Sequence, residues 1–497
     1  MSHHNQNTGD AFPSDPNSTT TSLEKKEDAT TTTDTTVDEV TMIRQRLKRK
    51  LDIRLTLWSM VAFLTLFIDK SNMPNAYISG MREDLDLESA VYNWADTMMS
   101  IGIIIFQIPA GVILPKIYPR WFFPSLAVTL GIIQCCMAFV KNHQGLLALR
   151  FFLGVSHSAI QPGIVYLLGT WYTEREIAKR ITTLRSMMGL GSGVGGLIAG
   201  AIVQTLANQA GLRAWQWLFV IEGLIVVAVG LAGYMMVPNY PHQTTSWIPE
   251  HERKATLDIQ ASGNAVIHSS SSPYKWENIR DGIVSPYPWL LGCINIFEIL
   301  LRQAVKTFVI ALNDLGYDSA FANYMSTPMH VFGCIVSAII GWSSDWFGDR
   351  VIHLTVTGIW ATAWNAVLAG VHQGHTPAPL LIVAGYALDP MSVIPSLAMI
   401  WSLIIYKGNP NLRALAVGII NCIGLLVPSL ITVKLWVVTD SPVFWLGKIT
   451  NVGFGCALIL TTWIVWFLLR VRFRLPQRAS NDIPSKEDQI KQTNDVA

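Results

Sequence analysis

Three charged residues are spaced so that one face of a helix would present all of them. Glu298, Arg302 and Lys306 follow one another at four-residue intervals inside a long apolar run. In an α-helix each such step drifts by only about 40°, so the three side chains share a face and climb about 12 Å. A guanidinium can hold a carboxylate through two parallel hydrogen bonds, and a lysine adds a second positive charge. The pattern predicts that Arg302 and Lys306 bind an organic anion; the alternative is a Glu298–Arg302 ion pair with Lys306 reaching outward.

Other ionisable residues lie near the centres of further apolar runs. His157 and Asp389 occupy such positions, where an ionisable side chain is costly and therefore needs a reason. Histidine titrates near neutral pH, which suits a proton acceptor. We expect His157, together with Glu298 or Asp389, to take up a coupling proton, and we expect His330 to be a packing residue.

Polar residues also cluster near the end of the first apolar run. Asp69, Lys70 and Asn72 lie there within four positions. One interpretation places Asp69 and Lys70 at the outer mouth of a central cavity as a gate; the other is a local ion pair between them. Asn72 and Asn421, in the eleventh run, are candidate substrate ligands.

The composition excludes several classes of protein. Hydrophobic residues make up 51% of the 497 residues and charged residues only 14%, far fewer than in soluble proteins. The net charge of +2 comes with no basic patch, so no nucleic-acid partner is expected. The six cysteines lack metal-ligand spacing and fall inside apolar runs. No nucleophile–base set appears, so we expect no metal, no cofactor and no enzyme activity.

The apolar runs predict an all-α membrane protein with twelve transmembrane helices in two six-helix bundles. Each run has about 20 residues, the length that crosses a bilayer. Lys and Arg gather on the side that holds both termini, which places that side in the cytoplasm. The predicted parts are a disordered tail (1–50), the first bundle (51–237), a cytoplasmic linker (238–285), the second bundle (286–470) and a C-terminal tail (471–497).

Two motifs resemble those of the major facilitator superfamily. The segment from Gly341 to Arg350 is similar to the family's G-x-x-x-D-x-x-G-x-R loop, in which Asp345 and Arg350 would pair at the cytoplasmic gate. The spacing of Leu146, Arg150 and Gly154 resembles a second motif of the family. The resemblance implies that the first, fourth, seventh and tenth helices line a central cavity.

A narrower resemblance covers most of the chain. Residues 68–85, the segment 218–223 and Asp440-Ser441-Pro442 are similar to the fungal anion:cation symporters of the allantoate permease family. Asn75-Ala76-Tyr77 and residues 176–180 are most similar to its pantothenate and biotin transporters. His157 stands where that family usually has an acidic residue.

Together these features predict a proton-coupled carrier in the fungal plasma membrane. It would take up a small monocarboxylate, such as pantothenate or biotin, by alternating access. We expect the carrier to act as a monomer, with protons and the lipid bilayer as its other partners. Two alternatives share the same features: an exporter of a pathway metabolite, and a nutrient receptor that does not transport.

Overall fold

A computed structural model describes residues 42–87, 89–172, 174–243, 247–259, 280, 283–371, 377–405 and 410–481. Within these ranges the chain is helical with short joints, and no β-strand occurs. Ten of the helices there are long and apolar enough to cross a membrane. The helix α4 and the interrupted segment α11–α13 occupy the two remaining places of a six-plus-six arrangement.

The first bundle begins with one long helical segment, Met42–Asp84. Asn142 starts the fourth helix of this bundle because its side chain accepts a hydrogen bond from the Gly145 amide, as helix N-caps do. The elements are η1 (Asp52–Thr56), α2 (Leu57–Ala76), η2 (Tyr77–Met81), α3 (Arg82–Asp84), α4 (Ser89–Ile113), α5 (Pro119–Met137), α6 (His143–Trp171), α7 (Glu174–Thr205) and α8 (Ala214–Met236).

The second bundle follows after a partly described linker that contains α9 (Glu250–Ile259). Gly348 ends one helix in the left-handed conformation, and Asp349 caps the next through the Ile352 amide. The elements are α11 (Pro286–Leu301), α12 (Gln303–Lys306), α13 (Phe308–Asp314), α14 (Ser319–Phe347), α15 (Arg350–Gly370), α16 (Ala378–Leu388), η6 (Asp389–Val393), α17 (Ile394–Ile405), α18 (Pro410–Leu435), η7 (Val438–Asp440) and α19 (Trp445–Asn481).

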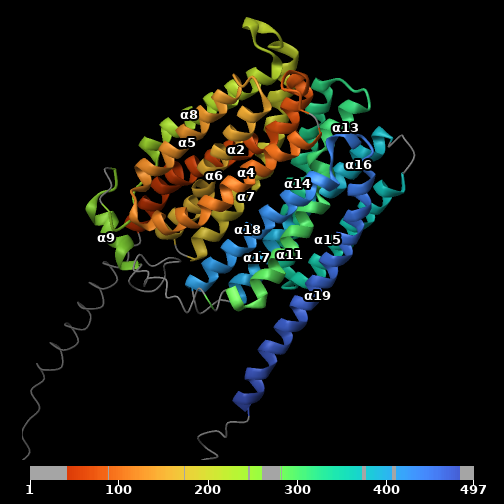
Figure 1. The fold of residues 1–497 in the computed structure, drawn as a ribbon. Coiled ribbons are helices and arrows are strands. Elements are labelled where there is room, and N and C mark those ends of the chain that lie inside the picture. The colour runs from red at the N-terminus through yellow and green to blue at the C-terminus, as the bar shows by residue number, and fades with distance from the viewer. Residues whose placement is uncertain are drawn as a thin grey trace, which may run out of the picture.

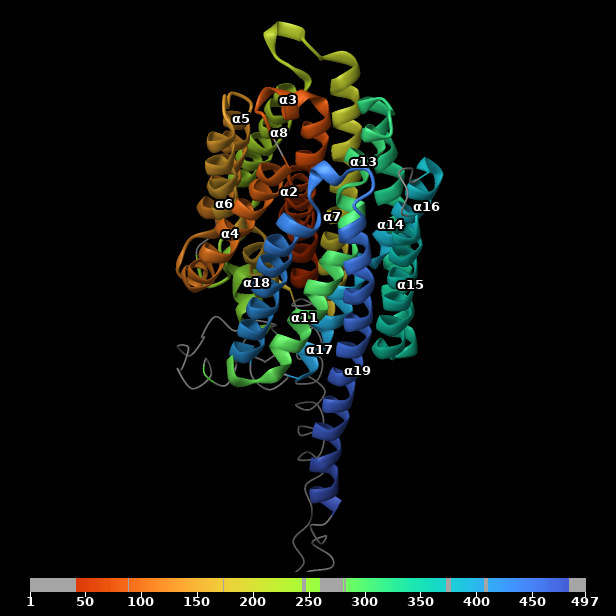
Figure 2. The same ribbon diagram turned by 45° about the vertical axis from the view of Figure 1, so that its right-hand side comes forward.

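The two bundles lie side by side, each around its own apolar core (Figures 1 and 2). They meet chiefly where α7 packs on α14 and where α4 packs on α18. We call the end that holds α9 and the last turns of α19 the terminal end, and the end that holds α3 and α13 the opposite end (Figures 1 and 2).

Several boundaries differ from the sequence prediction. Helical structure begins at Met42, within the predicted tail, and α19 extends to Asn481, beyond the predicted last span. The seventh span is interrupted at Arg302 and Thr307, whose backbone angles leave the helical region. The tenth span is interrupted by η6, where Pro390 cannot donate a backbone hydrogen bond.

Candidate functional site

Arg302 contacts two carboxylates instead of presenting a free guanidinium. It donates to Glu298 Oε1 at 3.2 Å and to Asp389 Oδ1 at 2.7 Å. Both acids are buried, with side chains 2% and 5% exposed. The Arg302 side chain, at the interruption of the seventh span, thus reaches the tenth-span interruption that carries Asp389. The arrangement contains the Glu298–Arg302 pair that the sequence analysis left as an alternative.

His330, which the sequence analysis placed among packing residues, contacts the same Asp389. Its Nδ1 lies 3.3 Å from Asp389 Oδ2. A methyl group added at Gly333, one turn further along α14, would collide with that carboxylate. The absence of a side chain at Gly333 therefore allows Asp389 to approach α14. We call Glu298, Arg302, His330 and Asp389 the C-cluster.

A second buried set lies within the first bundle, where α2, α6, α8 and α5 meet. His157 Nε2 lies 2.9 Å from Asp69 Oδ2, and the Asp69 side chain is fully buried. Asp69 thus pairs with His157 on α6, whereas no ion pair joins it to Lys70 in the described residues.

Arg150 and Glu222 complete this set through an amide between them. Arg150 donates to Asn72 Oδ1 at 3.1 Å, and the Asn72 amide donates to Glu222 Oε2 at 2.8 Å. Gln134 donates to the same carboxylate oxygen at 3.1 Å. Asn72, predicted to bind substrate, is fully buried in this network. We call Asp69, Arg150, His157 and Glu222, with Asn72 between them, the N-cluster.

The two clusters have the same charge balance. Each contains one guanidinium, two carboxylates and one imidazole, so each carries one excess negative charge when both carboxylates are ionised and its histidine is neutral. A net charge is expensive in a low-dielectric interior. Each cluster is therefore built to accept one positive charge, either a proton on the imidazole or carboxylate or a neighbouring cation.

Two lysines supply such cations at the boundary between the bundles. Lys70 of α2 and Lys306 of α12 are close enough for their ammonium groups to repel each other. In the described part of the chain neither forms an ion pair within 4.0 Å; Lys70 lies over the Phe67 ring at 5.0 Å, and Lys306 is exposed. Two neighbouring cations that form no close ion pair in the described residues can hold an anion between them.

The remaining predicted site residues are less constrained. Asn421 lies half-buried on α18, and no side-chain hydrogen bond to it occurs among the described contacts. Arg350 is the first residue of α15, and the side chain of Asp345 lies outside the described part of the structure.

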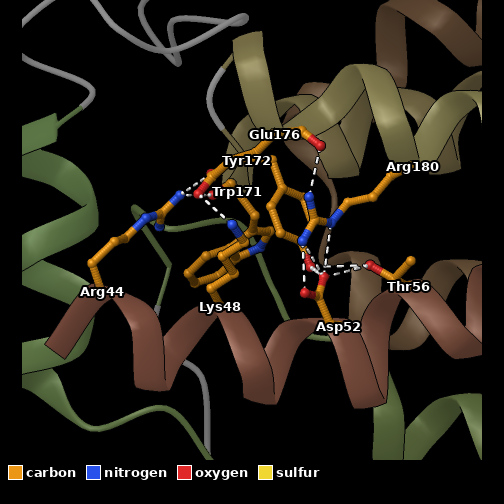
Figure 3. Close-up of polar contacts among 8 residues, drawn as sticks. All are labelled: Arg44, Lys48, Asp52, Thr56, Trp171, Tyr172, Glu176 and Arg180. Carbon is orange, nitrogen blue, oxygen red and sulfur yellow. Dashed lines mark hydrogen bonds and ion pairs between the residues drawn. The ribbon is translucent and has the colours of Figure 1, made fainter. Parts of the chain in front are cut away.

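The sequence analysis did not anticipate a polar cluster at the terminal end. Figure 3 shows Asp52 at its centre, bound by both Arg180 Nη2 and Nε at 2.5 and 2.7 Å. Tyr172 also donates to Asp52, at 2.8 Å, and Thr56 lies 3.0 Å from the Tyr172 oxygen. Burial raises the pKa of the Tyr172 hydroxyl above its usual range, so it remains a donor.

A second group of contacts extends this cluster along the first helix. Arg44 donates to Glu176 at 3.0 Å and to the Trp171 carbonyl at 2.9 Å, and Lys48 lies 3.3 Å from Glu176 (Figure 3). Together these contacts fasten the start of the first helix to the junction between α6 and α7. Basic residues before the first span, such as Arg44 and Lys48, gave the sequence analysis a signal of topology alone, because their partner Glu176 is more than 100 residues away in the chain.

Polar contacts between the bundles are prominent at the opposite end. Arg82 lies 3.7 Å from Asp314, and Ser319 donates to the Ile78 carbonyl at 2.8 Å. Asn93 donates to the Trp436 carbonyl at 3.0 Å. Nearer the terminal end, Arg185 of α7 donates to Ser396 of α17 at 2.9 Å. The bundles are thus held together at the opposite end by several independent contacts.

Proteins that are similar to this chain in sequence are described as transporters. A family model described as Major Facilitator Superfamily matches residues 58–432. The MFS-type transporter cnsO of Penicillium expansum is 28% identical over 446 residues, which are 86% of this chain and 84% of that protein. The putative metabolite transport protein NicT of Pseudomonas putida is 27% identical over 401 residues, covering 79% of this chain and 88% of that protein.

Solved structures share the fold. The xylose transporter XylE from E. coli, in a partially occluded inward-open conformation, superposes with a TM-score of 0.62 at 12% identity, over 83% of this chain and 98% of that chain. A bacterial homologue of the human lysosomal transporter Spinster, in an inward-facing and occupied conformation, gives a TM-score of 0.61 at 12% identity, over 82% and 95% of the two chains.

Proposed function

The chain belongs to the Major Facilitator Superfamily and is a membrane transporter, and we propose that it carries a small organic anion together with a proton. The observation that carries this proposal is the pair Lys70 and Lys306, one from each bundle, without an ion-paired carboxylate in the described residues. The helix that supplies Lys70, α2, contacts α13, the element that follows the one carrying Lys306, and an alternating-access carrier binds its cargo between its two halves.

Arg302 has a supporting role in this proposal. Its guanidinium is already shared by Glu298 and Asp389, so it cannot offer a free fork to a substrate carboxylate without losing an internal partner. Lys306 is the better candidate ligand from the seventh span, and Lys70 joins it from the first. Arg302 then fixes the charge of the C-cluster behind Lys306.

Charge balance links the anion to the proton. While the site is empty, Lys70 and Lys306 offset the excess negative charges of the N-cluster and the C-cluster. An anion that binds the lysines neutralises their positive charge. The negative charges of the N-cluster and the C-cluster are then no longer offset, so both clusters gain affinity for a proton. His157, paired with Asp69 at 2.9 Å, is the first acceptor. Each ligand then strengthens the binding of the other by the same factor, as linkage requires.

The proposed cargo is a monocarboxylate such as pantothenate or biotin, taken up across the plasma membrane. The resemblance of residues 68–85 and 176–180 to vitamin transporters supports this choice. Both termini would lie in the cytoplasm, since basic residues such as Arg44 and Lys48 gather at the terminal end. The contacts at the opposite end then close the carrier toward the outside.

An uptake assay with radiolabelled pantothenate and biotin tests this function. Cells that express the full chain should accumulate at least one of the two acids, and a protonophore should abolish the accumulation. Lys70→Ala and Lys306→Ala should each raise KM for the acid about 10- to 150-fold, since one charged contact contributes about 1.5–3 kcal/mol. KM for an uncharged ester of the same acid should change much less.

The exposed Lys141 in the loop before α6 provides the control. Lys141→Ala should leave KM for both compounds unchanged. Accumulation that resists the protonophore would contradict proton coupling. An equal effect of the Lys306 variant on acid and ester would contradict the anion site.

A further inference from the structure

We propose that the second bundle contains a proton-binding site of its own, formed by His330 and Asp389 and kept in charge balance by Arg302 and Glu298. The inference deepens the proposed function and rests on it, because it assigns a second proton to a carrier that already takes one at His157. It begins from four side chains of the seventh, eighth and tenth spans that converge inside one bundle.

The geometry makes Asp389 the centre of the site. One carboxylate oxygen accepts from Arg302 at 2.7 Å, and the other lies 3.3 Å from His330 Nδ1. Asp389 is the first residue of η6, so the interruption of the tenth span places its carboxylate against α14. The carboxylate and imidazole can share one proton between Oδ2 and Nδ1, which requires no rearrangement of Arg302.

The charged groups around His330 and Asp389 do not prevent a proton from binding there. From α11, Glu298 adds a second carboxylate to the single guanidinium of Arg302. From α12, Lys306 interacts with Glu298 but belongs to the proposed anion site. From α7, Arg185 is directed to Ser396 and Met399 of α17. From α14 itself, the Cys334 thiol donates to the Ser186 carbonyl. Asp314 of α13 approaches Arg82 at the opposite end.

The position of His330 allows the exposure of the proton site to change during transport. Its side chain is 17% exposed, whereas Asp389 is only 5% exposed. His330 lies on the face of α14 that meets Gly189 and Gly193 of α7, a helix of the other bundle. When the bundles rotate against each other, the covering of His330 must change while its contact with Asp389, which lies in the same bundle, can persist. A proton held there would be exposed to the two sides in turn.

Histidine NMR on the purified, full-length protein tests the site without any substrate. The chain is labelled with 13C-histidine, and the His330 signal is identified by its loss in His330→Gln. In the unaltered protein this signal should change as the pH is lowered and the imidazole takes up a proton. In Asp389→Asn its midpoint should move to a pH at least about one unit lower, because a carboxylate within ion-pair distance stabilises the protonated imidazole.

A second variant moves the carboxylate without removing any charge. Gly333→Ala places a methyl group against Asp389 and should shift the His330 midpoint in the same direction. Gly341→Ala on the same helix is the matched control, because its methyl group would meet only Val393, at an ordinary 3.8 Å. His353, which contacts Ser343 and the Asp349 carbonyl, is the control signal and should keep its midpoint in every variant.

The outcomes separate this inference from the proposed function. A His330 midpoint that is identical in the unaltered protein, Asp389→Asn and Gly333→Ala would overturn the second proton site. A His330 signal that does not titrate in the unaltered protein would also overturn it. Either result would leave the uptake assay, the protonophore response and the role of His157 unaffected, since the NMR titration uses the proton alone as the probe.

Discussion

At the residue scale, the buried charges depend on one another more than on the solvent. Arg302 is the only guanidinium that contacts Glu298 or Asp389 in the described residues, and both carboxylates are almost completely buried. Removing Arg302 leaves two buried carboxylates without a guanidinium, whereas removing the Glu298 charge as well leaves only Asp389, which keeps its contact with His330. Breaking a buried ion pair from one side typically costs about 3–5 kcal/mol.

We therefore expect Arg302→Gln to destabilise the purified protein by about 3–5 kcal/mol. The double variant Glu298→Gln with Arg302→Gln should recover a large part of that loss in thermal unfolding. It should not recover uptake, because Asp389 would still lack the guanidinium that positions its carboxylate, although the net charge of the C-cluster would be unchanged. A double variant with full uptake would show that the pair only stabilises the fold.

The contacts within the N-cluster and the C-cluster could be predicted from the sequence to different degrees. The four-residue spacing of Glu298 and Arg302 predicted their contact correctly as one of two alternatives. The pairing of Asp69 with His157, and of Asp389 with His330, joins residues 88 and 59 positions apart. Local spacing carries no information about such pairs, because their distance is set by how four helices pack.

At the element scale, the first helix is longer than a membrane span requires. Its extension from Met42 is held by Asp52, which binds Arg180 through two guanidinium nitrogens, and by Arg44 and Lys48, which reach Glu176. Lys50 adds a contact to Glu252 of α9 at 2.6 Å. The extension therefore connects the α6–α7 junction to the linker between the bundles.

Arg180→Gln should loosen this extension without unfolding the bundle. Asp52 is 39% exposed, so the lost contacts are partly screened and contribute about 1 kcal/mol. Amide hydrogen exchange in residues 42–52 should then become about fivefold faster. Arg49→Gln is the control, since the Arg49 side chain is exposed and forms no described ion pair. Equal exchange in the two variants would show that the Asp52 contact does not hold the helix.

Sequence reasoning located the elements better than their interruptions. Apolar runs of about 20 residues predicted helices that the structure confirms, because bilayer thickness fixes their length. The sequence analysis treated the seventh span as one continuous helix, although the chain leaves helical geometry at Arg302 and Thr307. Neither residue is a helix breaker, so the interruptions arise from packing and from the partners of Arg302.

At the scale of the whole molecule, two separate cores allow the bundles to move as units. Contacts such as Arg82–Asp314 and Ser319–Ile78 cross between them at the opposite end. Alternating access requires these contacts to open once per cycle. Contacts within one bundle, such as Arg213–Asp84 at 2.6 Å, have no such requirement.

Joining the bundles covalently at the opposite end should stop transport. Arg82→Cys with Asp314→Cys, in a chain whose six native cysteines are replaced, would be linked by a short bis-methanethiosulfonate reagent. Uptake should fall to background and return after reduction. The pair Asp84→Cys with Arg213→Cys lies at the same end within one bundle, and the same linker should leave its uptake intact. Undiminished uptake by the linked Arg82–Asp314 pair would contradict bundle rotation.

The division of the N-cluster and the C-cluster between two bundles has an electrical consequence. If each cluster loads one proton for every monovalent anion, each inward cycle moves one net positive charge across the membrane. A charge that crosses 100 mV gains about 2.3 kcal/mol, which corresponds to about fiftyfold accumulation. An interior-negative voltage would then drive uptake even at equal pH on both sides, and silencing either cluster would make the carrier insensitive to voltage.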